Sequence, residues 1–160
     1  MPIIEIELEI NAGIELCFDL SRSIDLHIAS TSKTKEKAID GRTSGLIELN
    51  EMITWEAIHF GIKQRLTSKI TIFNNPFYFR DEQVKGAFKY FIDDHYFEQK
   101  DVTTLAKERF EYEAPFGIIG RIFSFLILTR YMKKFLTNRN LFIKKVAESE
   151  EWKSYLKQND

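Results

Sequence analysis

The chain has 160 residues, of which 44% are hydrophobic and 29% are charged, and its formal net charge is −1. This length fits one domain and allows a sizeable buried core. Its single cysteine, Cys17, excludes an internal disulfide. The near-neutral charge lacks the basic excess of nucleic-acid-binding proteins, so we expect no nucleic-acid partner. Aromatic residues reach 14%, which predicts a bulky core or an aromatic-lined cavity.

The N-terminal residues Met1–Glu7 have neither the basic start nor the unbroken apolar run of a signal peptide. The longest apolar run, Phe125–Leu128, is too short to span a bilayer. These two patterns predict a cytoplasmic protein.

The first third of the chain predicts one strand and two short helices. Apolar residues alternate with glutamates over Ile4–Ile10, which is typical of a half-buried strand. Helical spacing follows over Ile14–Leu20 and Ile24–Ala29, with Ser23 as the N-cap of the second helix. The stretch Thr31–Ser44 is rich in Ser, Thr, Lys and Gly, and we expect an exposed loop there.

The middle of the chain predicts six more strands, and the end predicts one long helix. β-branched and aromatic residues mark the strands, and turn residues separate them. Turns this short favour an antiparallel meander. A helical segment of unusual length follows over Ile118–Ser149. The predicted strands are Leu46–Leu49, Met52–Phe60, Lys63–Phe73, Phe77–Lys85, Lys89–Gln99 and Thr103–Tyr112.

Several motifs within this layout resemble one large superfamily. They are Trp55–Gly61, Phe79, Asp81, Gln83, Gly86, Phe88, His95, Phe97, Thr104-Leu105, Tyr112 and Pro115–Gly117. The chain resembles the START-related, birch-pollen-allergen-like superfamily, also called SRPBCC or polyketide cyclase/dehydrase-like, and is most similar to its small bacterial members. The resemblance covers nearly the whole chain.

The resemblance implies an α+β helix-grip fold. In this fold, a curved seven-stranded antiparallel sheet wraps around a long C-terminal helix, and two short helices follow the first strand. It also implies an apolar tunnel between sheet and helix. We accordingly expect a single START-like ligand-binding domain over residues 1–149 and a C-terminal tail over residues 150–160. Members of the superfamily bind lipids, sterols or polyketides, and a minority catalyse cyclisation or related steps.

Strand periodicity predicts which side chains face the tunnel. Successive residues of a strand point to opposite faces, and the faces rich in Phe should point inward because apolar burial dominates stability. Polar residues share these inward faces. The ligand-binding candidates are therefore Trp55, His59, Phe79, Asp81, Gln83, Phe91, Asp93, His95, Phe97, Glu108, Phe110 and Tyr112.

This inward polar cluster has three interpretations. It is a satisfied structural network, or it orients the polar end of an apolar ligand, or it performs acid–base catalysis. In the catalytic case His95 or His59 carries the proton and Asp81 or Glu108 orients it. Two histidines and a carboxylate suit a metal, but no tight motif such as HExxH is present, so we expect neither a metal nor a cofactor. His27, alone on a mostly apolar helix, is interpreted as a packed residue.

The long helix carries seven basic and no acidic residues between Ile118 and Ala147. Its second half is amphipathic with a basic outer face, whereas Phe123–Leu128 is apolar nearly all round. Either the sheet grips the helix and its lysines are solvated, or spare apolar surface meets a membrane or a second subunit.

These patterns together favour binding of a small hydrophobic ligand, such as a lipid or polyketide, in an internal cavity. One alternative is a cyclase- or dehydratase-type enzyme that uses His95 or His59 with a carboxylate in the same cavity. Another is a module that binds a protein or membrane surface through the C-terminal helix, including a homodimer contact. We favour binding over catalysis.

Overall fold

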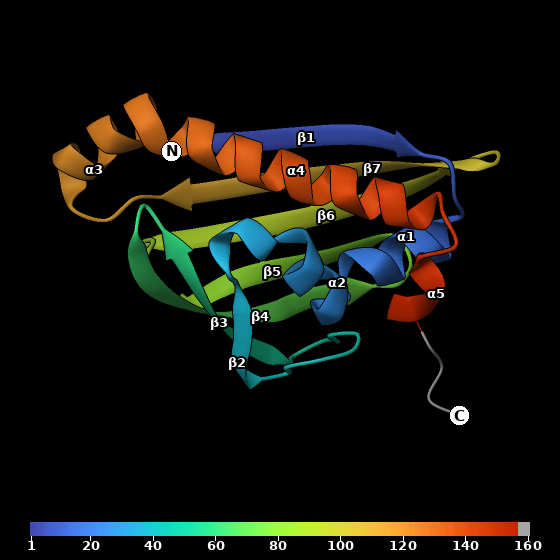
Figure 1. Cartoon of the computed structure of the whole chain (residues 1–160). Helices are drawn as coiled ribbons and strands as arrows, with labels where there is room; N and C mark the ends of the chain where they lie inside the picture. The colour runs from blue at the N-terminus through green and yellow to red at the C-terminus, as the bar shows by residue number, and fades with distance from the viewer. Residues whose placement is uncertain (157–160) are drawn as a thin grey trace.

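A seven-stranded antiparallel sheet forms the body of the structure, a computed structural model that describes residues 1–156. Its strand order is β1-β7-β6-β5-β4-β3-β2, and the sheet curves without closing (Figure 1). Each strand from β3 to β6 pairs with the next one along the chain, as a meander requires. The strands are β1 (Ile3–Ile10), β2 (Lys37–Gly41), β3 (Met52–His59), β4 (Ile62–Asn74), β5 (Tyr78–Lys85), β6 (Tyr90–Lys100) and β7 (Thr103–Glu113).

The helices lie on one side of this sheet, and the longest of them, α4, runs in front of β6 and β7 (Figure 1). The short helices α1 and α2 follow β1, as expected. The predicted helix-grip α+β architecture is confirmed. The helical elements are α1 (Ile14–Ser21), α2 (Ile24–Ser30), η1 (Ser32–Thr34), α3 (Gly117–Phe123), the π-helix η2 (Ser124–Leu128), α4 (Thr129–Ala147) and α5 (Trp152–Tyr155). Among residues 1–156, no helix combines the length and apolarity needed to cross a bilayer.

Local sequence explains the first elements. In β1, Ile4, Ile6 and Ile10 are buried, whereas the glutamates between them are exposed, as the alternation predicts. Ser23 caps α2, because its Oγ accepts a hydrogen bond from the Leu26 backbone N–H at 3.2 Å. This cap satisfies one of the free N–H groups at the helix start.

The second strand is not where the sequence predicts it. Residues Leu46–Leu49 form no strand, and Leu46 makes only an isolated bridge to Ser23. The strand is β2, inside the stretch expected to be a loop, and its Ala38 pairs with Trp55 of β3. Because β2 is an edge strand with mostly exposed side chains, backbone pairing holds it and no apolar alternation reveals it.

The predicted long helix is present but bent and subdivided. Helical structure runs from Gly117 to Ala147 and contains one π-helical turn. A left-handed Phe116, with φ of 69°, turns the chain out of β7. Gly120 then packs against the Pro115 carbonyl so closely that a Cβ atom would lie 1.8 Å from the oxygen. Only glycine fits there, which fixes the angle at which α3 leaves the sheet.

The expected C-terminal tail is partly placed. Within residues 150–156, Trp152, Tyr155 and Leu156 pack against the apolar core near α1. Residues 157–160 of this tail lie outside the described residues. The domain boundary at residue 149 stays a prediction.

The buried apolar side chains form two clusters along the molecule. One cluster lies around Phe18 of α1 and includes Phe97 of β6 and Ile143 of α4. The other includes Phe91 of β6 and Leu136 of α4. On each element the residues between the two clusters are polar, so a buried polar layer separates the two apolar regions.

Candidate functional site

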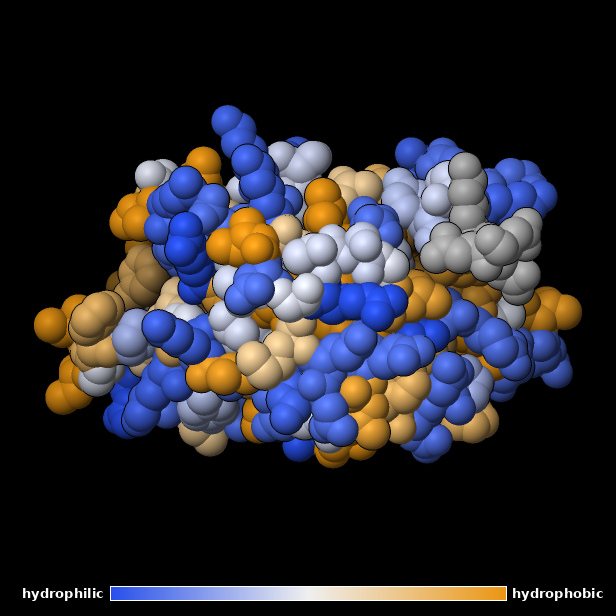
Figure 2. Space-filling model, turned by 90° about the horizontal axis from the view of Figure 1, so that it is seen from below, coloured by the Kyte–Doolittle hydropathy of each residue, from blue (hydrophilic) through white to orange (hydrophobic). Residues whose placement is uncertain are grey.

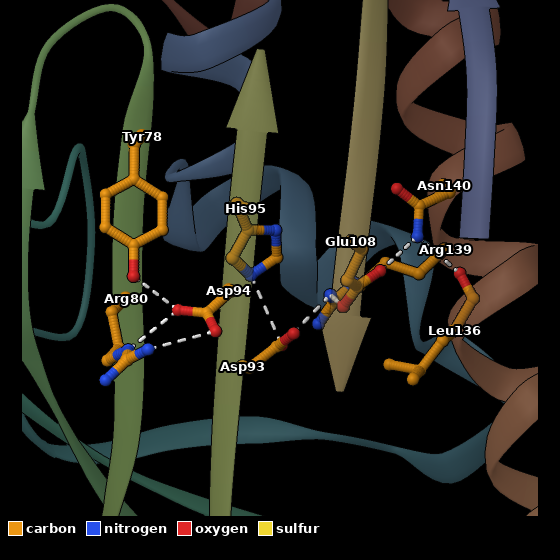
Figure 3. Close-up of polar contacts among 9 residues, drawn as sticks. All are labelled: Tyr78, Arg80, Asp93, Asp94, His95, Glu108, Leu136, Arg139 and Asn140. Carbon is orange, nitrogen blue, oxygen red and sulfur yellow. Dashed lines mark hydrogen bonds and ion pairs between the residues drawn. The ribbon is translucent and has the colours of Figure 1, made fainter. Parts of the chain in front are cut away.

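The polar layer is built from β6, β7 and α4. Asp93 and His95 lie between Phe91 and Phe97 on β6, and Glu108 lies opposite His95 on β7. Arg139 and Asn140 approach from α4 (Figure 3). Strand alternation therefore places the two β6 side chains on the inner face, as the sequence predicts.

Arg139 connects the members of this layer. Its guanidinium contacts Oε1 of Glu108, and its Nη2 lies 3.5 Å from Oδ2 of Asp93. The Nε2 of His95 lies 3.2 Å from the same Asp93 oxygen. Asn140 donates to Oε2 of Glu108 and also to the Leu136 carbonyl (Figure 3). Two cations thus face two carboxylates in a nearly closed network.

Burial and pairing compete in setting the protonation of this layer. Burial lowers the pKa of His95, but the Asp93 carboxylate outweighs this effect and raises it above its ordinary value. Burial raises the pKa of Asp93, but His95 and Arg139 hold it below its ordinary value. Burial raises the pKa of Glu108 to about 7, although Arg139 lowers it. Asp93 and His95 are therefore a buried ion pair.

A separate polar group occupies the outer face of the same strand. Asp94 accepts hydrogen bonds from the Tyr78 hydroxyl at 2.5 Å and from Arg80 Nε at 2.7 Å. Asp93 and Asp94, adjacent in sequence, thus serve different faces of β6 (Figure 3). The Asp94 carboxylate is paired with Tyr78 and Arg80 on this outer face, and the group faces away from the inner layer.

A cavity of about 910 Å³ lies between the sheet and the C-terminal helices, on the α3 side of the polar layer. Its walls are mainly apolar, and Asp93 and Arg139 reach it from the polar layer. Apolar and aromatic lining residues include Trp55, Leu66, Phe88, Phe91, Phe110, Leu128, Met132, Phe135 and Leu136.

Half of the predicted ligand-binding residues line this cavity. The six are Trp55, His59, Asp81, Phe91, Asp93 and Phe110. They come from the four strands β3, β5, β6 and β7 and line one space, and their role in binding stays a proposal.

The other six predicted residues lie outside the cavity lining, and each has a structural partner. Phe79 and Phe97 each pack edge-on against Phe18 with ring centroids 5.5 Å apart. The Tyr112 hydroxyl and the Thr129 hydroxyl lie 2.7 Å apart.

The remaining three hold backbone or side chains in place. Gln83 donates to the Phe88 carbonyl at 2.9 Å and so fixes the turn between β5 and β6. The ring of His95 stacks on Phe79 with centroids 4.3 Å apart. The Glu108 carboxylate contacts the Arg139 guanidinium, as described above.

The sequence interpretation missed a second polar group in the cavity wall. The Nε2 of His27 lies 3.2 Å from Oε1 of Glu36, and the His27 ring lies over Trp55 with centroids 4.3 Å apart. His59 Nδ1 lies 2.6 Å from the Tyr131 hydroxyl. Glu36 was assigned to a loop, and only the pairing of β2 with β3 brings it to the cavity.

The side chains of Glu36 and His59 in this wall differ in charge. Burial raises the pKa of Glu36, but His27 outweighs burial and keeps it below its ordinary value. Burial lowers the pKa of His59, and Glu36 only partly offsets this effect. Glu36 is therefore charged near neutral pH, while His59 is neutral.

Three buried residues have the composition of a metal site. Ligand atoms of Asp93, His95 and Glu108 all lie within 4.8 Å of one another. The Arg139 guanidinium, however, contacts both carboxylates and already supplies the positive charge that a metal would bring. The set is better explained as an ion-pair network than as a metal centre.

Comparison with known proteins identifies the fold. No protein-family model and no curated protein matches the chain. Solved structures match nearly its whole length. TTHA0849 from Thermus thermophilus superposes with a TM-score of 0.73 at 16% identity, over 90% of this chain and 95% of that one. The chain has a Bet v1-like, SRPBCC-type fold.

Two further neighbours agree with this assignment. The ginseng major latex-like protein 151 from Panax ginseng gives a TM-score of 0.67 at 14% identity, over 92% of this chain and 98% of that one. Ara h 8.0201 gives 0.65 at 8% identity, over 90% and 98%. At such identities the SRPBCC-type likeness is one of fold, and function has to be argued from the cavity.

Proposed function

We propose that this protein binds a small hydrophobic molecule, such as a lipid or a polyketide, in the cavity between the sheet and the C-terminal helices. The observation that carries the proposal is the cavity of about 910 Å³ with mainly apolar walls. Sites for small molecules typically enclose about 300–1,000 Å³ and combine apolar walls with a few polar groups. The superfamily's use of the same space for lipids, sterols and polyketides supports the proposal.

The positions of His95 and His59, the two histidines predicted as proton carriers, favour binding over catalysis by either of them. His95 is outside the cavity lining and is held by Asp93 and by stacking on Phe79. His59 does line the cavity, but its Nδ1 is paired with the Tyr131 hydroxyl and not with a carboxylate. A general base needs direct reach to the substrate and a suitable orienting partner. Neither histidine combines both properties.

The proposal is tested by native mass spectrometry of gently purified protein and by titration with N-phenylnaphthylamine, an uncharged apolar fluorophore. We expect saturable fluorescence enhancement with one site per chain. Leu66→Trp places a larger side chain in the cavity wall and should abolish binding, whereas Ile72→Trp, on the exposed part of the same strand, should not. Equal binding by all three proteins would contradict the proposal.

A second function is supported by an exposed apolar surface. Along α3 and η2 a run of large apolar side chains is exposed, and Figure 2 shows apolar groups projecting at the α3 end of the molecule. We call this the apolar collar. Its residues are Phe116, Ile118, Ile119, Ile122, Phe123, Phe125, Leu126 and Ile127, together with Phe60 and Ile62 of the adjoining β3–β4 turn.

The collar surrounds one end of the cavity. Phe60, Ile62, Phe116, Ile119 and Phe123 belong both to the collar and to the cavity lining. An apolar ligand that left the cavity here would therefore meet apolar surface before water.

The charges beside the collar indicate what it contacts. Residues 115–134 carry four basic residues, Arg121, Arg130, Lys133 and Lys134, and no acidic ones. All four are exposed. Apolar side chains flanked by basic residues suit the surface of an anionic bilayer. We propose that the collar rests on such a surface while ligand enters or leaves, and the Discussion describes the test.

A further inference from the structure

Four buried oxygen atoms in the cavity wall have no hydrogen-bond partner among residues 1–156. They are Oε2 of Glu36, Oγ of Ser68, Oδ1 of Asp81 and Oδ1 of Asp93. All four residues line the cavity. Ser68 is fully buried, and the side chains of Asp93 and Glu36 are only 6% and 10% exposed. Buried polar atoms of native proteins are almost always paired, so these four mark a place for another molecule.

The arginines of the described cavity wall are already engaged. Arg139 contacts Glu108 and Asp93, Arg65 pairs with Glu56, and the His27 ring lies beside Glu36. His95 adds a second positive charge against Asp93.

Asp81 is the carboxylate left over from this pairing. It has no ion pair in the described structure, and burial raises its pKa to about 7, with the neighbouring Ser68 hydroxyl opposing the rise and the Asp93 carboxylate adding to it. Asp81 is half-buried and its Oδ1 is enclosed; such a carboxylate is unfavourable when it lacks a cation, and a bound cation would relieve this cost. The site therefore offers hydrogen-bond acceptors and one uncompensated negative charge.

We propose that the ligand is an amphiphile with a protonated amine as its polar head, which binds at Asp81 beside Ser68 and Asp93. This inference rests on the proposed function and specifies the ligand class. The ammonium group donates to the unpaired oxygens of Asp81, Asp93 and Ser68, and the apolar body extends along Phe91, Phe110 and the inner side of α4 toward the collar.

A carboxylate head does not fit this end of the cavity. It has no protons to give to the unpaired oxygens, and it would lie among Asp81, Asp93 and Glu36. Of the two arginines that line the cavity, Arg65 is paired with Glu56, and Arg139 would have to leave Glu108 in order to meet a carboxylate head, which would strand a buried carboxylate.

The test compares dodecylamine with dodecanoate, which share one alkyl chain and differ only in the head. Each compound, kept below its critical micelle concentration, competes with N-phenylnaphthylamine in the full-length protein, at a pH above about 7 where Asp81 is ionised. A charge-assisted hydrogen bond is worth about 1.5–3 kcal/mol. We therefore expect dodecylamine to displace the fluorophore at a concentration at least about tenfold lower than dodecanoate.

Asp81→Asn should remove most of this preference. Asp81 has no ion pair within residues 1–156 and its Oδ1 has no hydrogen-bond partner there, so the variant leaves no cation unpaired, and the asparagine can still accept from the Ser68 hydroxyl. Glu82→Gln, one residue along β5 on the opposite face, makes the same chemical change and should retain the full preference. Circular dichroism should show that both variants are folded.

The outcomes separate this inference from the proposed function. Displacement by both compounds at equal concentrations, or a preference for dodecanoate, overturns the ammonium assignment and leaves the apolar cavity intact. Equal loss of preference in Asp81→Asn and Glu82→Gln overturns the role of Asp81. Failure of the fluorophore and of both amphiphiles to bind overturns the ligand-binding function and this inference together.

Discussion

The guanidinium of Arg139 on α4 contacts the carboxylate of Glu108 on β7, and this contact ties the gripped helix to the sheet. Both side chains lie in the polar layer between the two apolar clusters. Because Arg139 also lies 3.5 Å from Asp93, one guanidinium serves two buried carboxylates. The layer thus fixes the position of α4 along the sheet and closes the inner end of the cavity.

Replacement of Arg139 should be strongly destabilising. In Arg139→Met, Glu108 loses its cation and Asp93 keeps only His95, so buried negative charge is left unpaired. Breaking a buried ion pair from one side costs about 3–5 kcal/mol. Denaturant unfolding measures this cost. Arg130→Met, on an exposed part of the same helix, is the matched control and should change the free energy of unfolding by less than about 1 kcal/mol. A similar small effect in both variants would contradict the role given to Arg139.

Asp81 should make stability fall as pH rises. Its pKa is about 7 in the folded protein and 3.8 in the reference state, so between these values the native state binds a proton that the unfolded chain has released. The free energy of unfolding therefore decreases through this window, and the penalty is fully present above about 7. Each pKa unit corresponds to about 1.4 kcal/mol, which makes the total a few kcal/mol.

Asp81→Asn isolates this effect. The variant should be more stable than the parent above about pH 7 and should lose that advantage as pH falls toward 3.8. Chemical denaturation across this range, with Glu82→Gln measured in parallel, gives the comparison. An advantage that does not change with pH would show that Asp81 is not the titrating group.

The Asp93–His95 pair loses its contribution to stability at both ends of the pH range. The pKa of Asp93 is lowered, so its contribution is present above 3.8 and is lost as pH falls through the folded-state value. The pKa of His95 is raised, so its contribution is complete below 6.5 and is lost as pH rises through the folded-state value. NMR titration of the His95 ring should give a pKa above 6.5, and a lower value would contradict the buried ion pair.

Much of the sheet could be predicted because alternation is a local signal. The glutamates between Ile4, Ile6 and Ile10 identify β1, and the same rule places Asp81, Asp93 and His95 on inward faces. The edge strand β2 could not be predicted in this way. Its Lys37–Gly41 side chains are mostly exposed, and its pairing with β3 depends on residues distant in sequence.

The candidate site was harder to predict because its two polar groups depend on contacts across the fold. Glu36 reaches the cavity only through β2. Arg139 belongs to a helix with many basic residues, yet it lies three residues after buried Leu136 and four before buried Ile143, which places it on the inward side. That spacing was the available signal. Conversely, Phe79 and Phe97 face inward as predicted but fill the core around Phe18, because α1 occupies that end of the sheet.

Gly120 should be essential for the geometry of the cavity entrance. A Cβ at this position would lie 1.8 Å from the Pro115 carbonyl oxygen, so Gly120→Ala must displace α3 or the end of β7. We expect weaker binding of N-phenylnaphthylamine and a loss of stability of about 1–3 kcal/mol. Gly13→Ala is the control, because a Cβ at that position would approach no atom more closely than 3.9 Å. If Gly120→Ala retains the stability and the affinity of the parent, the close packing described here is not required.

The apolar collar should bind anionic vesicles. Phe125 and Ile118 are 83% and 73% exposed and lie outside the cavity lining, so Ile118→Asp/Phe125→Asp alters the surface and leaves the cavity intact. Burying a large apolar side chain in a bilayer interface is worth about 1.5–3 kcal/mol. Loss of two such side chains should lower co-sedimentation with phosphatidylglycerol vesicles by more than about tenfold. Salt should weaken the binding of the parent protein, because the basic residues beside the collar are exposed.

Val102→Asp is the matched control for this experiment. Val102 is 77% exposed in the turn between β6 and β7, at the opposite end of the molecule from α3 (Figure 1). The Val102→Asp variant should bind anionic vesicles as well as the parent protein does. Failure of the parent protein to bind anionic vesicles would overturn the membrane proposal. If sedimentation velocity then showed a dimer that Ile118→Asp/Phe125→Asp dissociates, the collar would instead be a contact between two copies of this chain, because the same apolar side chains would be buried without lipid.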